Sequence, residues 1–197
     1  MNTLKDSKTK YNLMKAFAGE SQARNRYTFG ASLAKSQNLE LIYRVFNYTS
    51  DQEKAHAWVF YKHLKDLSGQ SITIDTGYPV DVYNDLEKTL RTSQQHEYEE
   101  WDKIYKEFAQ IAKEEGFMSV SNSFEKISEI EKIHGDRFGR FADAIKSNTL
   151  FKSDKEEKWI CLNCGHIHTG KEVPNACPVC QYPQGYFILY SISPFEN

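Results

Sequence analysis

The sequence predicts a mainly α-helical protein in which a four-helix bundle with one long crossover precedes a small cysteine-rich domain. Three observations lead to this fold class. Apolar residues recur at spacings of three and four through residues 1–146, with few helix breakers. Residues 68–83 interrupt that pattern and show no helical period. All four cysteines of the 197-residue chain lie between residues 161 and 180.

Four helices are expected near residues 7–35, 39–67, 85–114 and 119–146. Residues typical of turns separate them, at Ser36-Gln37-Asn38, Ser68-Gly69 and Glu115-Gly116-Phe117. Because the first and third breaks are short, the helices that they join should be antiparallel neighbours. Residues 68–83 are too long for a tight turn. Extended at about 3.3 Å per residue, they reach about 50 Å and can return along the bundle.

The chain turns polar after the last helix, and residues 147–158 are expected to be a linker between a first domain, 1–146, and a second, 159–197. About 39 residues are too few for a stable apolar core, so a metal should stabilise the second domain. Two Cys-x-x-Cys pairs, Cys161/Cys164 and Cys177/Cys180, are typical of a tetrahedral thiolate site. Zinc there would be structural, whereas iron would transfer single electrons.

Each predicted helix carries acid on a mainly apolar face. The residues are Glu20 on the first helix, Glu53 on the second, Glu97 and Glu100 on the third, and Glu131 on the fourth. A one-residue slip of the third helix would replace Glu100 by its neighbour Glu99. An ionised carboxylate removed from water costs several kcal/mol unless it is paired, so cations should lie between the helices.

The register of these acids supports one shared site. Glu20 and Glu53 are 33 residues apart, Glu97 and Glu131 are 34 apart, and the midpoints fall at the predicted turns. The two acids of each antiparallel hairpin should therefore face each other at one height. Four helices arranged in this way match the ligand pattern of di-iron carboxylate bundles.

Two histidines accompany the acids at helical spacing. His56 follows Glu53 by three residues and His134 follows Glu131 by three, so each pair shares a helix face. Oxygen ligands with a little imidazole favour iron or manganese. The acids and His134 nearly complete two iron shells, so His56 is either an alternate ligand or a partner of a ligand.

Composition excludes other classes of function. With 25 basic and 27 acidic residues the formal charge is −2, so no strong field favours nucleic acid or an anionic membrane. The N-terminus lacks the apolar segment of a secretory signal, and no run of about 18 apolar residues occurs. We expect a cytoplasmic protein with neither nucleic acid nor membrane as partner.

Several motifs follow one another through the chain. In the bundle they are Phe17-Ala-Gly-Glu20-Ser-Gln-Ala-Arg24-Asn-Arg26-Tyr27, Glu53-Lys-Ala-His56, Glu97-Tyr-Glu-Glu100-Trp and Glu131-Lys-Ile-His134. In the cysteine segment they are Trp159-Ile-Cys161-Leu-Asn-Cys164-Gly165 and Cys177-Pro-Val-Cys180. In this order the motifs closely resemble the rubrerythrin family over essentially the whole chain, and those of the cysteine segment resemble its rubredoxin-like module. The resemblance implies a ferritin-like four-helix bundle with one long crossover, plus a small C-terminal rubredoxin-like metal-binding β domain.

The resemblance also implies cofactors: two irons bridged by carboxylates and an oxo group, and one iron, or zinc in its place, in the four-cysteine site. One iron would be held by Glu20, Glu53, Glu100 and Glu131, and the other by Glu53, Glu97, Glu131 and His134. Glu53 and Glu131 would bridge, and His56 would replace Glu100 on reduction. Tyr27 and Tyr105 match positions that hydrogen-bond near the site. The cysteine ligands would be Cys161, Cys164, Cys177 and Cys180.

The activity that the resemblance implies is that of a non-haem di-iron peroxidase, which reduces hydrogen peroxide to water with electrons relayed through the iron of the four-cysteine site. The electrons would come from NAD(P)H through a separate reductase or a rubredoxin-type donor, since the chain has no Gly-rich dinucleotide fingerprint. A homodimer with swapped domain contacts is expected. The alternatives are a ferroxidase or iron-handling protein, a zinc-ribbon binding module on a structural bundle, and a di-iron oxygenase.

Two positions depart from the family pattern. Lys106 follows Tyr105 where many relatives have proline, so a less kinked third helix is expected. Gln181 follows Cys180 where free-standing rubredoxins have glycine, which leaves the backbone geometry of that turn open.

Overall fold

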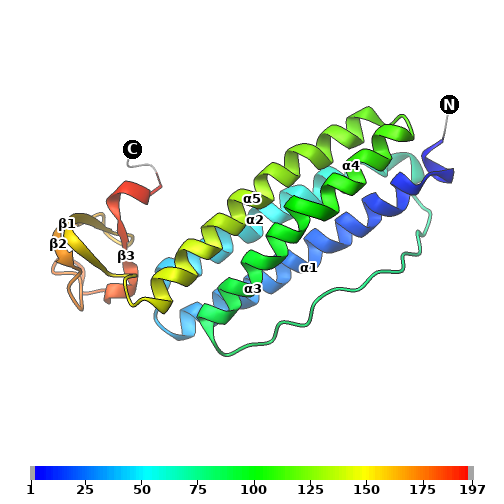
Figure 1. The fold of residues 1–197 in the computed structure, drawn as a ribbon. Helices are drawn as coiled ribbons and strands as arrows, with labels where there is room; N and C mark the ends of the chain where they lie inside the picture. The colour runs from blue at the N-terminus through cyan, green and yellow to red at the C-terminus, as the bar shows by residue number, and fades with distance from the viewer. Residues whose placement is uncertain (1–2, 195–197) are drawn as a thin grey trace.

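The computed structural model describes residues 3–194, and its main feature is an elongated helical bundle (Figure 1). The helices are α1 (Lys8–Ser36), α2 (Glu40–His63), α3 (Leu86–Glu99), α4 (Tyr105–Glu114) and α5 (Met118–Lys146). The segments α3 and α4 follow one another in the place of a single long helix. The four-helix architecture expected from the sequence is therefore confirmed. No helix of the described residues is both long and apolar enough to cross a bilayer.

Local chemistry accounts for the helix boundaries. The side chain of Ser7 accepts a hydrogen bond from the amide of Lys10 and begins α1, and Asp85 accepts one from Lys88 and begins α3. Asn38 in the α1–α2 turn and Gly116 in the α4–α5 turn have φ angles of 59° and 88°. These left-handed conformations favour Asn and Gly, so both hairpin turns end their helices sharply.

The third helix is not the single, less kinked α-helix expected over residues 85–114. A π-helical turn, Glu100–Ile104, separates α3 from α4, and the amide of Tyr105 donates to the carbonyl of Glu100. The absence of proline at position 106 therefore does not give a regular helix. The sequence did not predict this turn, because a π turn needs no proline and has no compositional signature. Such turns are common at functional sites, and this one starts at a candidate ligand.

The crossover is an extended segment, residues 68–85, that runs alongside α1 (Figure 1). The phenol of Tyr78 donates to the carbonyl of Lys15 at 2.9 Å, and Arg26 pairs with Asp81 at 3.1 Å. These two contacts attach the segment to α1 at points several turns apart. The crossover expected at residues 68–83 is confirmed.

The C-terminal domain contains a three-stranded antiparallel sheet in the order β2-β1-β3. The strands are β1 (Lys152–Cys161), β2 (Ile167–Glu172) and β3 (Phe187–Leu189). Residues 152–158 of the expected linker thus belong to β1. The strand was mistaken for a linker because its first half is largely exposed and polar, while its last three residues are buried. Only residues 147–151 connect α5 to the sheet.

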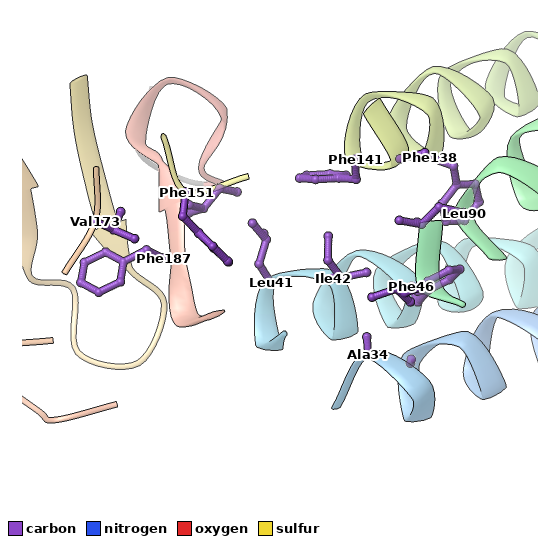
Figure 2. Packing of buried hydrophobic residues seen from close by; sticks show 14 of the residues in the cluster. Ala34, Leu41, Ile42, Phe46, Leu90, Phe138, Phe141, Phe151, Val173 and Phe187 are labelled. Atoms are coloured by element: carbon purple, nitrogen blue, oxygen red, sulfur yellow. The ribbon is translucent and has the colours of Figure 1, made fainter. Parts of the chain in front are cut away.

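This domain packs against the end of its own bundle. Phe151, Val173 and Phe187 belong to the same buried cluster as Leu41 at the start of α2, and Phe151 lies beside Leu41 in Figure 2. Arg44 on α2 donates to the carbonyl of Leu162 at 3.1 Å. The backbone of the domain also comes close to the bundle at Gly185, where an added Cβ atom would overlap the carbonyl oxygen of Asn38.

We predict that Gly185→Ala weakens this junction, since the added methyl cannot fit against backbone atoms without moving the domain. The loss of unfolding free energy should be about 1–3 kcal/mol, and residues 147–151 should be cleaved faster in limited proteolysis. Gly77→Ala is the control, because a Cβ there meets no atom within 4 Å. Equal proteolysis rates for the two variants would contradict the predicted packing.

Candidate metal centre

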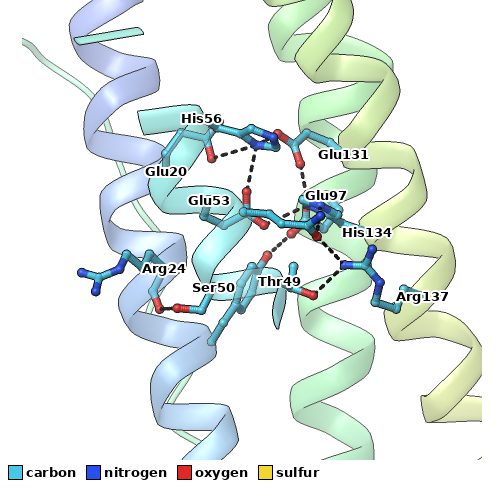
Figure 3. A network of polar contacts seen from close by, with 12 residues as sticks. Glu20, Arg24, Thr49, Ser50, Glu53, His56, Glu97, Glu131, His134 and Arg137 are labelled. Carbon is cyan, nitrogen blue, oxygen red and sulfur yellow. Dashed lines mark hydrogen bonds and ion pairs between the residues drawn. The ribbon is translucent and has the colours of Figure 1, made fainter. Parts of the chain in front are cut away.

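Acidic and imidazole side chains from α1, α2, α3 and α5 converge inside the bundle (Figure 3). Six of the seven bundle ligands expected from the sequence are at most 6% exposed: Glu20, Glu53, His56, Glu97, Glu131 and His134. The seventh, Glu100, is half-buried. Its neighbour Glu99 is exposed and bonded by Gln95, so the register of the third helix turns Glu100 to the site.

Two carboxylates span the space between the two imidazoles. Glu53 places one oxygen 3.1 Å from His56 Nδ1 and the other 2.9 Å from His134 Nδ1. Glu131 does the same, at 2.9 Å from His56 and 2.8 Å from His134. The imidazole rings are nearly parallel, with centroids 5.5 Å apart. Each carboxylate thus serves two adjacent positions, as a ligand bridging two metals must.

The remaining acids lie on the outer sides of this pair. Glu20 Oε2 is 3.9 Å from His56 Nδ1, and Glu97 Oε2 is 3.6 Å from His134 Nδ1. Oxygens of Glu97, Glu100 and Glu131 also lie within 4.8 Å of one another. The site therefore contains one half around His56 and another around His134, joined by the two spanning carboxylates.

The donor atoms that face the centre fit two cations. Among the described residues, the following buried atoms have no hydrogen-bond partner: Glu20 Oε2, both oxygens of Glu53, Glu97 Oε2, both oxygens of Glu131, His56 Nδ1 and His134 Nδ1. Each such atom left unpaired costs about 1–3 kcal/mol. Oxygen and imidazole donors in this ratio suit iron or manganese. Binding two such ions would satisfy the whole set.

Charge repulsion in the cluster leads to the same conclusion. Burial, followed by the neighbouring acids, raises the pKa of Glu20, Glu100 and Glu131 well above 4.5. Although burial opposes it, contact with the acids raises the pKa of His134 to about 12. Contact with His134 and His56 lowers the pKa of Glu53 to about 2, again against the effect of burial. Protons thus compensate charge that metal ions would otherwise balance.

Two buried tyrosines hold the outer acids. The phenol of Tyr27 donates to Glu97 Oε1, and that of Tyr105 donates to Glu20 Oε1 at 2.5 Å. In both acids the second oxygen remains directed to the centre. Burial, then the nearby carboxylates, raises the pKa of both phenols well above 10, so they stay protonated donors.

Sequence reasoning missed the residues that orient His134. Its Nε2 lies 3.1 Å from the side-chain oxygen of Gln52, which also accepts from Arg137 at 3.0 Å. Arg137 in turn donates to Thr49 at 2.8 Å. Because the Gln52 oxygen can only accept, His134 donates to it from Nε2, so Nδ1 is the nitrogen that would bind a metal once its own proton is displaced. The available signal was spacing, since Arg137 follows His134 by three residues.

The four cysteines form a second site at the other end of the chain. The sulfur atoms of Cys161 and Cys180 are 3.7 Å apart, as are those of Cys164 and Cys177. Four sulfurs at about 2.3 Å from a tetrahedral ion are about 3.8 Å apart, whereas a disulfide is far shorter. The backbone amide of Tyr182 lowers the pKa of Cys180 to about 6, while burial raises that of Cys161 to about 12. A metal would keep all four ionised.

Both cysteine pairs form the same backbone turn despite the missing glycine. The amide of Gly165 donates to the carbonyl of Cys161 at 2.8 Å, and that of Gln181 donates to Cys177 at 2.9 Å. The φ angles are 77° for Gly165 and 64° for Gln181. Gln181 therefore adopts the left-handed conformation that favours glycine, at a cost of about 1–2 kcal/mol. The rubredoxin-like geometry is retained at this turn.

Comparison with known proteins agrees with both sites. The sequence profile described as Rubrerythrin matches residues 11–142. The chain belongs to the rubrerythrin family. A second profile, described as the rubredoxin-like domain of rubrerythrin, matches residues 159–188. Rubrerythrin of Clostridium perfringens is 42% identical over 96% of this chain and 98% of its own length. Rubrerythrin of Nitratidesulfovibrio vulgaris is 38% identical over 98% of this chain and 100% of its own length.

Solved structures show the same fold. A mixed-valence nigerythrin is 28% identical, with a TM-score of 0.63 over 96% of this chain and 92% of its own. Desulfovibrio desulfuricans bacterioferritin has a TM-score of 0.66 at 22% identity, and the match covers 76% of this chain and 87% of that chain. This similarity establishes the ferritin-like fold. As a member of the rubrerythrin family, this protein has a di-iron site at the carboxylates and histidines and a rubredoxin-like site at the four cysteines.

We predict that Gln52→Ala lowers the affinity of the di-iron site about 10- to 100-fold, because His134 loses the partner that fixes its orientation. Metal titration of the apoprotein measures the change. Gln95→Ala is the control, because Gln95 is exposed and its side chain donates to the exposed Glu99. An unchanged affinity in Gln52→Ala would show that packing alone orients the imidazole.

Metal-free protein should be more stable at about pH 5 than at about pH 8. Folded Glu20, Glu100 and Glu131 have raised pKa values, so the folded state binds more protons than the unfolded state above pH 4.5. His134, with a pKa raised from 6.5 to about 12, acts in the same direction over this range. The lowered pKa of Glu53 reduces stability on acidification, but only below about pH 4.5.

Thermal unfolding of apo and iron-loaded protein at the two pH values tests this. The apoprotein should melt higher at the lower pH, and loading should remove the difference because metal ions replace the protons. An apoprotein that melts equally at both values, or lower in acid, would mean that the acids are not forced together.

Proposed function

We propose that the protein is a non-haem di-iron peroxidase that reduces hydrogen peroxide to water, with the electrons relayed through the cysteine site. The family suggests an oxidoreductase. One observation carries the finer proposal: Glu53 and Glu131 each present one oxygen to each half of a two-metal site. Reduction of H2O2 to two water molecules needs two electrons and two protons, which a pair of one-electron metals matches.

Bound iron would supply one electron from each ion to the O–O bond. The chain's own residues would hold the pair: Glu53 and Glu131 link the halves, while Tyr27 and Tyr105 hold Glu97 and Glu20 in place. His56 and Glu100 are proposed to alternate as ligands of one half, because each has a ligand atom within 4.8 Å of an oxygen of Glu131. The harder carboxylate suits ferric iron, and ferrous iron tolerates imidazole.

Electrons are proposed to arrive from the cysteine site of a second chain. The C-terminal domain contacts its own bundle at Asn38 and Leu41, and Glu53 lies twelve residues farther along α2, about 18 Å at 1.5 Å per residue. Such a distance disfavours transfer within one chain and favours a homodimer with swapped domain contacts. A separate NAD(P)H-dependent reductase or a rubredoxin-type protein would supply the cysteine site.

Rapid mixing of the fully reduced protein with hydrogen peroxide tests the proposal. The di-iron site should reoxidise faster with peroxide than with dioxygen. Cys180→Ser should keep this single reoxidation but lose sustained NAD(P)H-linked turnover, because the relay is broken. Faster reaction with dioxygen, together with uptake of iron beyond the fixed sites, would instead favour a ferroxidase or iron-handling protein.

A further inference from the structure

The di-iron site is closed on most sides, and its accessible edge is at Glu100. The other six bundle ligands are buried, whereas Glu100 is half-buried and lines a cavity of about 160 Å³. The cavity lies between α1, the π turn and the crossover segment. Larger cavities of about 870 and 590 Å³ are lined by none of the seven ligands.

Gly19 and Tyr78 line this cavity beside Glu100. A Cβ atom on Gly19 would lie 3.8 Å from Glu100 Oε1 and 3.8 Å from Cε1 of the Tyr78 ring. The absence of a side chain at position 19 therefore leaves the space between the ligand carboxylate and the ring. Tyr78 comes from the crossover, is 39% exposed and lines the same cavity as Glu100.

The crossover is fixed beside this ring by a partly buried polar cluster. Arg26 on α1 lies 3.1 Å from Asp81 of the crossover and 2.7 Å from His96 on α3. Asp81 and His96 are 3.5 Å apart. The Tyr78 phenol adds its bond to Lys15 at 2.9 Å. The side of the cavity formed by the crossover is thus held by contacts to two helices.

We propose that the oxidising substrate reaches the di-iron site through this cavity, and that Gly19 and Tyr78 restrict it to molecules of the size of hydrogen peroxide. The proposal deepens the proposed function and depends on it for the substrate. A volume of about 160 Å³ accommodates a few molecules of water size. Sites for drug-sized ligands have about 300–1,000 Å³, so bulky organic hydroperoxides are excluded.

The first experiment compares cumene hydroperoxide with hydrogen peroxide in the iron-loaded full-length protein. In Tyr78→Ala the ratio of kcat/KM for cumene hydroperoxide to that for hydrogen peroxide should rise about tenfold or more. Tyr78→Phe keeps the ring and should keep the ratio. Tyr83→Ala is the matched control, because Tyr83 is in the crossover but does not line the cavity.

The second experiment does not depend on turnover. Azide binding to the oxidised di-iron site is followed by visible absorption in Gly19→Ala and in the native protein. The added methyl narrows the passage at ordinary contact distance without forcing Glu100 to move, so azide association should slow several-fold while iron content stays the same. Tyr83→Ala, which changes the crossover outside the lining of the cavity, should associate at the native rate.

The results separate the two proposals. Native azide kinetics in Gly19→Ala, with an unchanged hydroperoxide ratio in Tyr78→Ala, would place the access route elsewhere and overturn this inference. Slower azide association in Gly19→Ala together with no peroxide reduction by the native protein would support the route and overturn the peroxidase. If Tyr78→Ala does not fold, the azide measurement alone decides.

Discussion

Mutual repulsion among five glutamates inside one bundle is the constraint on which the rest of the structure depends. Glu20, Glu53, Glu97 and Glu131 are buried where water screens their charges poorly, and Glu100 is half-buried beside them. Two histidines, even when protonated, balance only part of this charge. Hydrophobic packing above and below the cluster sets the helix positions, with Phe46 and Phe138 on one side and Phe60 and Phe124 on the other. The bundle therefore holds the acids together, and metal ions make that arrangement favourable.

The surrounding polar groups decide which oxygens remain free for metal. Tyr27 and Tyr105 each use one oxygen of an outer acid, whereas both oxygens of Glu53 and Glu131 are left for the centre. This difference distinguishes terminal from spanning carboxylates without any difference in residue type. The cysteine domain solves the same problem differently, with backbone amides directed at sulfur and a turn repeated in both pairs. Two unlike metal sites thus arise from one short chain.

The features that follow from regular spacing could be predicted from the sequence. Those that depend on contacts between distant segments could not. The positions of Glu20, Glu53 and Glu131 follow from helical period and hairpin register, and the four-cysteine site follows from motif spacing. The π turn could not be inferred, because Glu100–Ile104 has an ordinary helical composition. Residues 152–158 were mistaken for a linker because an exposed strand is as polar as a linker. Gln52, Arg137 and Tyr78 act through tertiary contacts that no local pattern records.

The π turn also determines the phase between the two halves of the third helix. A π turn holds one residue more than the α-helical turn it replaces, and each residue of an α-helix advances the chain by about 100°. Glu97 and Tyr105 are eight residues apart, which in a regular α-helix leaves them about 80° apart around the axis, but with one residue taken up by the π turn they differ by only about 20°. Rewinding Glu100–Ile104 into a regular α-helix would therefore rotate α4 by about 100° and carry Tyr105 away from Glu20. Removing one residue along with the π turn would leave α3 and α4 in place.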